Sequence, residues 1–271
     1  MMDTISKPQL YHAPSSYYSM IARLALAEGG IAYDPIYMDI HARKSQQEPD
    51  YARLNPNMTV PTLILTDRVL DQSRAIALYA LGVSDTALDA ETAAWLDRHY
   101  AYPIEELTFG HILSRHPVAR VMIPRVLSGT HRRLLRLAAA NPDLAPVYQA
   151  RAGVFAERMR TFDPGSATRL WERRRDEAIS MLDGMDQTLA DGRATMAQAG
   201  YGVADVVLTV FLARMSFTGL GGEIAKRPGL RRYWRAMQAR PSFGTADIWT
   251  TIHTGRLIGA ILGLGRQSRP A

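Results

Sequence analysis

The chain has 271 residues and is 47% hydrophobic, so it can bury a core large enough for two modest domains or one large domain. It has no cysteine, which excludes disulfides, cysteine-based zinc sites and a nucleophilic thiol of its own. Its 32 basic and 26 acidic residues give a net charge of +6, but no nucleic-acid-binding motif accompanies this excess, which we interpret as solvated helix faces that also attract anionic ligands.

The first part of the chain alternates between strand and helix patterns. We expect strands at 9–12 and 33–39, a polar loop at 41–51, a hairpin of 62–65 with 69–70, and helices at 19–29 and 73–81. This order of strand, helix, strand, loop, hairpin and helix predicts an α/β domain of thioredoxin type over residues 8–82.

The chain beyond a linker at 82–90 is poor in strand patterns. Helical periodicity covers 91–102, 117–140, 145–160, 166–189, 204–217 and 230–240. We therefore predict an all-helical bundle over residues 91–250, followed by a tail at 251–271.

The N-terminal residues carry no apolar signal region. Residues 1–8 are polar, and no segment reaches the roughly 18 apolar residues of a membrane-spanning helix, so we expect a cytoplasmic protein without stable membrane insertion. The tail is apolar at 257–264. We expect it to fold over a substrate cleft, with a weak membrane or partner contact as the alternative.

Pro61 opens the predicted strand at 62–65, a position where proline is tolerated. In thioredoxin-type folds a proline here adopts the cis peptide, which turns the N–H and C=O of the preceding residue toward a peptide-like ligand. We expect this geometry at Val60.

Gln72 and Ser73 stand at the start of the predicted helix at 73–81. Unpaired N–H groups and the positive end of the helix dipole attract a carboxylate at such a position. An ordinary N-cap is the alternative interpretation.

The stretch Ser15 to Ser19, with sequence SSYYS, lies between the first strand and the first helix. A hydroxyl that donates to a sulfur atom there favours thiolate over thiol. A free thiol has a pKa near ~8.5, and one such hydrogen bond plus the helix terminus supply roughly 2 to 4 kcal/mol, enough to make the thiolate dominant near neutral pH. Helix capping again explains each hydroxyl singly, but the three segments together favour a ligand site.

These segments resemble the glutathione transferase superfamily, specifically its zeta-like bacterial branch. The matching stretches are SSYYSMIARLAL at 15–26, YARLNPNMTVPTL at 51–63, LDQSRAIALYAL at 70–81 and GYGVADVVLTVFLARM at 200–215. Within the superfamily the chain most resembles tetrachlorohydroquinone reductive dehalogenases, which complete their reduction with a cysteine at the position of Tyr18.

The resemblance implies glutathione as co-substrate and a homodimer. It assigns the cysteinyl backbone of glutathione to Val60 and Pro61, the γ-glutamyl carboxylate to Gln72 and Ser73, and the sulfur to Ser16, with Ser15, Tyr17 and Tyr18 as second-choice activators. It also makes 201–206 an N-capping box in which Asp205 reaches back to the helix start, an element of folding rather than catalysis.

A second-substrate site is expected between the two domains. Its candidate residues are Tyr17, Tyr102, Phe109, His111 and Arg214. Core packing is the alternative for the aromatic residues, a structural role for the histidine, and a surface ion pair for Arg214.

We interpret the chain as a glutathione transferase in which Ser16 lowers the pKa of the bound thiol. The thiolate then attacks a hydrophobic, aromatic or halogenated electrophile. One alternative is a glutathione-dependent cis-trans isomerase of the maleylacetoacetate or maleylpyruvate type, which needs no protein cysteine. Another is a non-catalytic glutathione- or partner-binding module. We expect no metal and no nucleic-acid partner.

Overall fold

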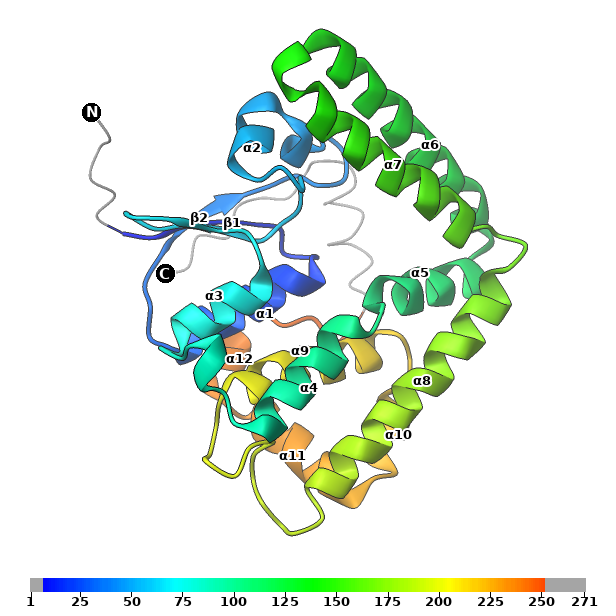
Figure 1. The fold of residues 1–271 in the computed structure, drawn as a ribbon. Coiled ribbons are helices and arrows are strands. Elements are labelled where there is room, and N and C mark those ends of the chain that lie inside the picture. Colours follow the sequence, from blue (N-terminus) through cyan, green and yellow to red (C-terminus); the bar gives the residue numbers. More distant parts are fainter. Residues whose placement is uncertain (1–6, 252–271) are drawn as a thin grey trace. The chain divides into compact units, whose positions relative to one another are not determined.

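A computed structural model describes residues 7–251 of the chain (Figure 1). The contacts divide it into two compact units. Among the described residues, the first contains 7–46, 59–101 and 182–251, and the second contains Gln47–Met58 and Tyr102–Met181. The apolar stretch 257–264 of the predicted tail lies outside the described residues. No helix among residues 7–251 is both long and apolar enough to cross a membrane.

A four-stranded mixed sheet organises the first unit. Its strands are β1 (Gln9–His12), β2 (Asp34–Tyr37), β3 (Thr62–Ile64) and β4 (Val69–Leu70), in the order β2-β1-β3-β4. β1 runs parallel to β2 and antiparallel to β3, which is antiparallel to β4. The predicted thioredoxin-type order is confirmed.

The helices α1 (Tyr17–Glu28) and α3 (Ser73–Ala80) pack on each other in the first unit. α1 buries Met20, Ile21 and Leu24 almost completely. Gly29 ends α1 at a point where any side chain would collide with the carbonyl of Ala80 at the end of α3. This close approach requires glycine at position 29. Gly30 follows with a φ of 64°, the left-handed conformation in which many helices end, so α1 stops at the predicted pair of glycines.

The first unit also contains the long buried helix α9 (Val203–Phe217), against which α4 (Ala90–Ala101), α10 (Gly221–Ala225) and α11 (Pro228–Gln238) pack. α12 (Pro241–Thr245) packs on α1 and α11, and the last turns of α8 (Ala167–Thr188) complete the unit. α9 is buried along almost its whole length. The Asp205 carboxylate accepts from the N–H of Gly202 at 2.9 Å, which confirms the predicted contact back to the helix start.

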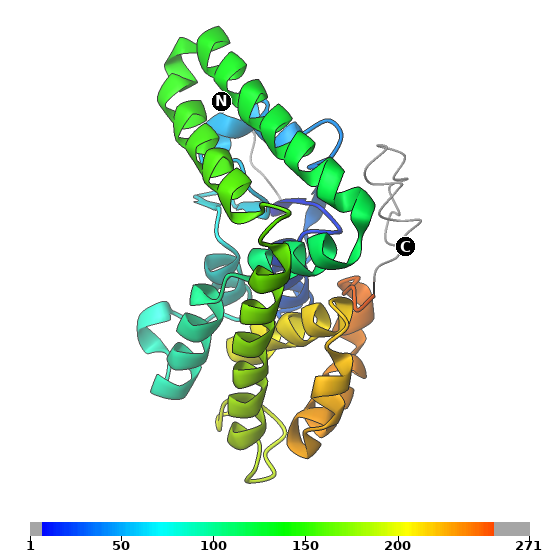
Figure 2. The ribbon, with the colours of Figure 1, turned by 90° about the vertical axis from the view of Figure 1, so that its right-hand side faces the viewer.

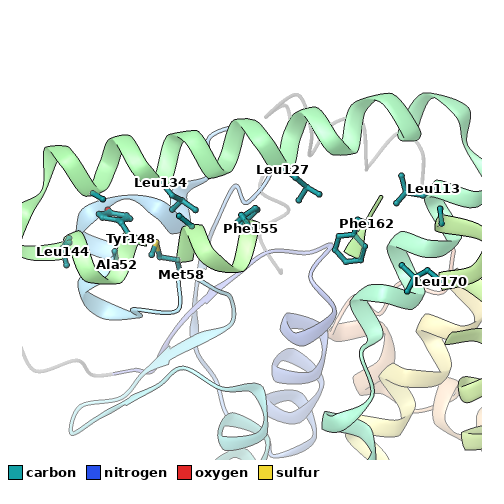
Figure 3. Close-up of a cluster of buried hydrophobic side chains, with 13 residues drawn as sticks. Ala52, Met58, Leu113, Leu127, Leu134, Leu144, Tyr148, Phe155, Phe162 and Leu170 are labelled. Atoms are coloured by element: carbon teal, nitrogen blue, oxygen red, sulfur yellow. The ribbon is translucent and has the colours of Figure 1, made fainter. Parts of the chain in front are cut away.

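The second unit is helical. It contains α2 (Pro49–Leu54), α5 (Ile104–Arg115), α6 (Pro117–Ala140), α7 (Ala145–Thr161) and the first turns of α8. α6 and α7 run side by side (Figures 1 and 2), and Leu134, Tyr148 and Phe155 belong to the hydrophobic cluster between and below them (Figure 3). The Tyr148 hydroxyl donates to the carbonyl of Gln47 at 2.9 Å, which ties the α2 segment into this unit.

Four helices were not predicted from the sequence, and α1 begins two residues before the predicted helix at 19–29. α2, α10 and α12 have only five or six residues each, too few for a periodic pattern. α5 was not predicted because it contains Gly110, and glycine disfavours a helix. A Cβ atom there would lie 3.1 Å from the backbone nitrogen of Trp171, so glycine allows α8 to approach α5 closely.

Candidate functional site

One edge of the sheet gathers the three segments that the sequence singles out. Tyr11 of β1 pairs with Thr62 of β3, and because these strands are antiparallel, the end of β1 lies beside the start of β3. Leu70, the last residue of β4, pairs with Leu63 near that same start. The segments around Ser16, Val60 and Ser73 therefore leave the sheet at one edge. The parallel strand β2 ends there too.

Ser16 is the N-cap of α1. Its Oγ accepts from the N–H of Ser19 at 3.3 Å. This contact uses a lone pair of the hydroxyl oxygen and leaves the hydroxyl proton for another acceptor. Among residues 7–251, no group accepts that proton. Capping and donation to a ligand are therefore compatible at Ser16.

The neighbouring Ser15 is engaged differently. Its Oγ lies 3.0 Å from Nε2 of His41, an exposed residue in the loop after β2. That loop is ordered by Asp39, whose carboxylate accepts from the N–H groups of His41 and Ala42 at 3.0 and 2.9 Å. The hydroxyl of Ser15 thus has a protein partner.

The Val60–Pro61 peptide is cis, as the sequence predicts. Val60 is buried and directly precedes β3. The strand register sets this peptide beside the loop that follows β1 and carries Ser15 and Ser16.

The start of α3 has no side-chain cap. Gln72 occupies the N-cap position in an extended conformation, but its side chain makes no capping hydrogen bond. Ser73 follows it, buried, and its Oγ shares a hydrogen bond of 3.1 Å with the Tyr100 hydroxyl. An uncapped helix start combines orphan N–H groups with the positive end of the dipole, so this position suits a carboxylate.

Two tyrosines extend the site from α1 toward α4. Tyr18 stacks on Tyr100, with ring centroids 6.4 Å apart. The Tyr17 hydroxyl shares a hydrogen bond of 2.6 Å with Nε2 of His99, which is only 3% exposed. Burial lowers the pKa of His99 to about 3, so this imidazole is neutral at neutral pH. These contacts connect the Ser16 segment to Ser73 through aromatic side chains.

Arg214 of α9 is 6% exposed, and its guanidinium lies over the ring of Tyr17, 5.3 Å from the centroid. Burial lowers the pKa of Arg214 to about 10, which leaves it protonated at neutral pH. The surface ion pair considered from the sequence does not exist among the described residues.

A second buried arginine, Arg23 of α1, fixes the loop that carries the serines. It donates to the carbonyls of Ala13 and Pro14 in that loop at 3.3 Å each. It also donates to the carbonyls of Ala246 and Asp247 at 2.8 and 3.1 Å. The segment after α12 is thus attached to the loop in front of α1.

The other proposed second-substrate residues lie in the second unit. The Tyr102 hydroxyl donates to the carbonyl of Arg174 at 2.7 Å, and Phe109 packs on Phe162. His111 is buried against Trp171, and burial lowers its pKa to about 4. Within this unit all three serve packing.

Sequence reasoning missed His41, His99 and Tyr100, since no local pattern connects them to Ser15, Tyr17 and Ser73. Arg23 did give a signal, because a charged residue among the apolar residues of a helix must find buried partners.

Comparison with known proteins identifies the family of this chain. Residues 6–82 match the family model described as the glutathione S-transferase N-terminal domain. The chain is 30% identical over 249 residues to tetrachloro-p-hydroquinone reductive dehalogenase of Sphingobium chlorophenolicum, covering 88% of this chain and 95% of the relative. The chain belongs to the glutathione S-transferase superfamily. It is a glutathione-dependent enzyme with glutathione as co-substrate.

Further relatives match most of the chain. Glutathione S-transferase TCHQD of Arabidopsis thaliana is 28% identical, with 87% of each chain covered. Among solved structures, the beta-etherase LigF of Sphingobium sp. strain SYK-6 has a TM-score of 0.64 at 15% identity, covering 89% of this chain and 98% of that one. A glutathione transferase of Burkholderia graminis, solved with two glutathione molecules per subunit, has a TM-score of 0.61 at 19% identity, covering 89% and 87%. At these identities the solved structures establish the fold.

Proposed function

We propose that this enzyme conjugates glutathione to a carbon electrophile of hydrophobic, aromatic or halogenated character, and that Ser16 activates the thiol. Residues 8–82 form the glutathione domain in this proposal, and residues 91–250 the substrate domain. The observation that carries it is the free hydroxyl proton of Ser16 at the start of α1.

The three parts of glutathione have matching groups at the sheet edge. The backbone of Val60 pairs with the cysteinyl residue beside the cis Pro61. The γ-glutamyl carboxylate binds the uncapped start of α3 at Gln72 and Ser73. With these ends held, the sulfur reaches Ser16.

The energetics of the thiol are favourable. Lowering a thiol pKa from ~8.5 to ~6 requires about 3.4 kcal/mol of preference for the thiolate. A hydrogen bond to a charged acceptor contributes about 1.5 to 3 kcal/mol, and a helix start contributes roughly 0.3 to 2 kcal/mol. Together they suffice, and the thiol proton leaves to solvent.

Attack on a haloarene then forms the S–C bond and breaks the C–halogen bond, with the halide as leaving group. A relative is named a reductive dehalogenase. Because this chain has no cysteine, no protein thiol is available to take the glutathionyl group as a mixed disulfide. The glutathione conjugate is therefore the proposed product.

The test compares Ser16→Gly, Ser16→Thr and Ser15→Ala. Glycine removes the hydroxyl at a capping cost of only a few tenths of a kcal/mol, whereas threonine keeps both the cap and the donor. With 1-chloro-2,4-dinitrobenzene as electrophile, we expect Ser16→Gly to raise the pKa of the bound thiol by about 1 to 2 units, measured by thiolate absorbance. Turnover at neutral pH should fall accordingly while the Kd of glutathione changes little.

Retention of turnover and of thiolate absorbance in Ser16→Gly would transfer the role to Ser15, Tyr17 or Tyr18. Absence of thiolate in the wild-type complex would instead support a binding module without catalysis. We expect Ser15→Ala to have the smaller effect, since the hydroxyl of Ser15 is engaged with His41.

We also propose a homodimer in the cytoplasm, following the usual assembly and glutathione use of this superfamily. Light scattering coupled to size-exclusion chromatography tests the assembly. A monomeric mass at micromolar concentration would contradict it.

A further inference from the structure

Arg214 is a buried cation without an anionic partner among the residues that the structure describes. Only 6% of its surface is exposed, and its guanidinium forms no ion pair or hydrogen bond with any described residue. Its Nε is fully buried and unpaired. Its contacts are with aromatic rings, 5.3 Å from the Tyr17 centroid and 4.7 Å from that of Phe217.

Ring contacts do not offset this burial. Desolvating a guanidinium costs more free energy than cation–π contacts with two rings return. Arg23 shows the alternative in the same unit: it is 5% exposed, and its donors reach four backbone carbonyls. Within the described part of the chain the guanidinium of Arg214 has no such acceptor, which leaves its donors for a ligand.

The position of Arg214 indicates which kind of ligand it binds. Tyr17, the ring beneath the guanidinium, directly follows Ser16, and its hydroxyl is fixed by His99. Among residues 7–251, the titratable groups that act on Arg214 are the phenols of Tyr17 and Tyr18, so no carboxylate there compensates its charge. It lies beside the helix turn at which the thiolate is proposed to form.

We propose that Arg214 binds an ionised acidic group, a carboxylate or phenolate, of the second substrate, so that the preferred electrophile of this enzyme is itself an organic acid. This inference rests on the proposed function. The planar guanidinium donates two parallel hydrogen bonds to an oxyanion, and the aromatic surfaces of Tyr17 and Phe217 favour a flat substrate. The γ-glutamyl carboxylate of glutathione already has its own site at α3.

The test uses two electrophiles that differ in charge: 4-chloro-3-nitrobenzoate and its methyl ester. In both, the thiolate displaces chloride from the ring. We expect Arg214→Gln to lower the ratio of kcat/KM for the acid to that for the ester by roughly tenfold to a hundredfold, the effect of one hydrogen-bonded charge pair. Arg214→Lys should restore part of the ratio, and Arg231→Gln, an exposed arginine on α11, should leave it unchanged.

Binding without turnover gives an independent result for the wild-type protein, even if an Arg214 variant does not fold. We expect 3-nitrobenzoate to compete with the electrophile at least tenfold better than neutral 3-nitrobenzamide, corresponding to about 1.4 kcal/mol. Equal inhibition by the two would overturn the proposal. An unchanged acid-to-ester ratio in Arg214→Gln, or a loss confined to glutathione affinity, would do the same. If neither electrophile is consumed, the proposed function fails instead.

Discussion

Titration of His99 gives a direct test of the buried contacts behind the site. His99 is 3% exposed, and burial lowers its pKa from 6.5 to about 3. The unfolded chain takes up a proton below about pH 6.5, whereas the folded chain stays neutral until about pH 3. Stability due to this group is therefore complete above pH 6.5 and declines as the pH falls.

The slope is about 1.4 kcal/mol per pH unit once the unfolded histidine is fully protonated, so moving from pH 7 to pH 5 costs about 2 kcal/mol. The pKa values of His12 and His111 are lowered as well, so their contributions to stability also decrease as the pH falls. We therefore measure the free energy of unfolding in urea at pH 7 and pH 5 for wild type and His99→Gln. The contribution of His99 is the loss of stability in wild type minus the loss in the variant.

His99→Phe serves as a second non-titrating variant that keeps an aromatic ring but loses the contact with Tyr17. We expect the two variants to differ in stability at pH 7 and to share the same reduced pH dependence. If wild type and both variants lost stability in parallel between pH 7 and pH 5, His99 would titrate alike in the folded and unfolded chain. The interpretation of His99 as a buried, neutral imidazole beside Tyr17 would then be wrong.

Three further predictions concern the fold. Asp205→Ala should cost about 3 to 5 kcal/mol in urea unfolding, because the carboxylate accepts from the N–H groups of Met196 and Gly202 and from the Tyr233 hydroxyl; a cost below 1 kcal/mol would contradict this. Gly110→Ala should cost about 1 to 3 kcal/mol by forcing α5 away from α8, and retention of the wild-type Tm would show that the helices give way easily. Tyr148→Phe should cost about 1 kcal/mol and increase amide exchange in α2, with unchanged exchange as the opposing result.

The sequence predicted elements well where a long amphipathic pattern existed. The helix predicted at 117–140 is α6 with the same bounds, because its pattern continues over many turns. α5 was missed because Gly110 serves helix packing, and packing is not visible in a local pattern.

In the candidate site, too, some residues could be predicted from the sequence and others could not. Hydroxyls, proline and glutamine at element ends predicted the segments that meet at the sheet edge, because the order of strands determines which ends share an edge. The partners His41 and Tyr100 come from 26 and 27 residues away in sequence. Only the folded register brings them to Ser15 and Ser73, so no spacing rule could have named them.

The N-termini of α1 and α3 at this sheet edge differ in their hydrogen-bond donors. The difference fits the thiolate and the carboxylate of glutathione. α1 is capped by the Ser16 oxygen, which satisfies one N–H and leaves a single hydroxyl proton directed to a partner. α3 is uncapped by side chains and leaves several N–H groups open. A thiolate is one polarisable atom and is served by one donor, whereas a carboxylate has two oxygens and needs several. Exchanging the N-cap residues Ser16 and Gln72 should therefore impair both thiol activation and carboxylate binding, since each helix start would then present the wrong number of donors.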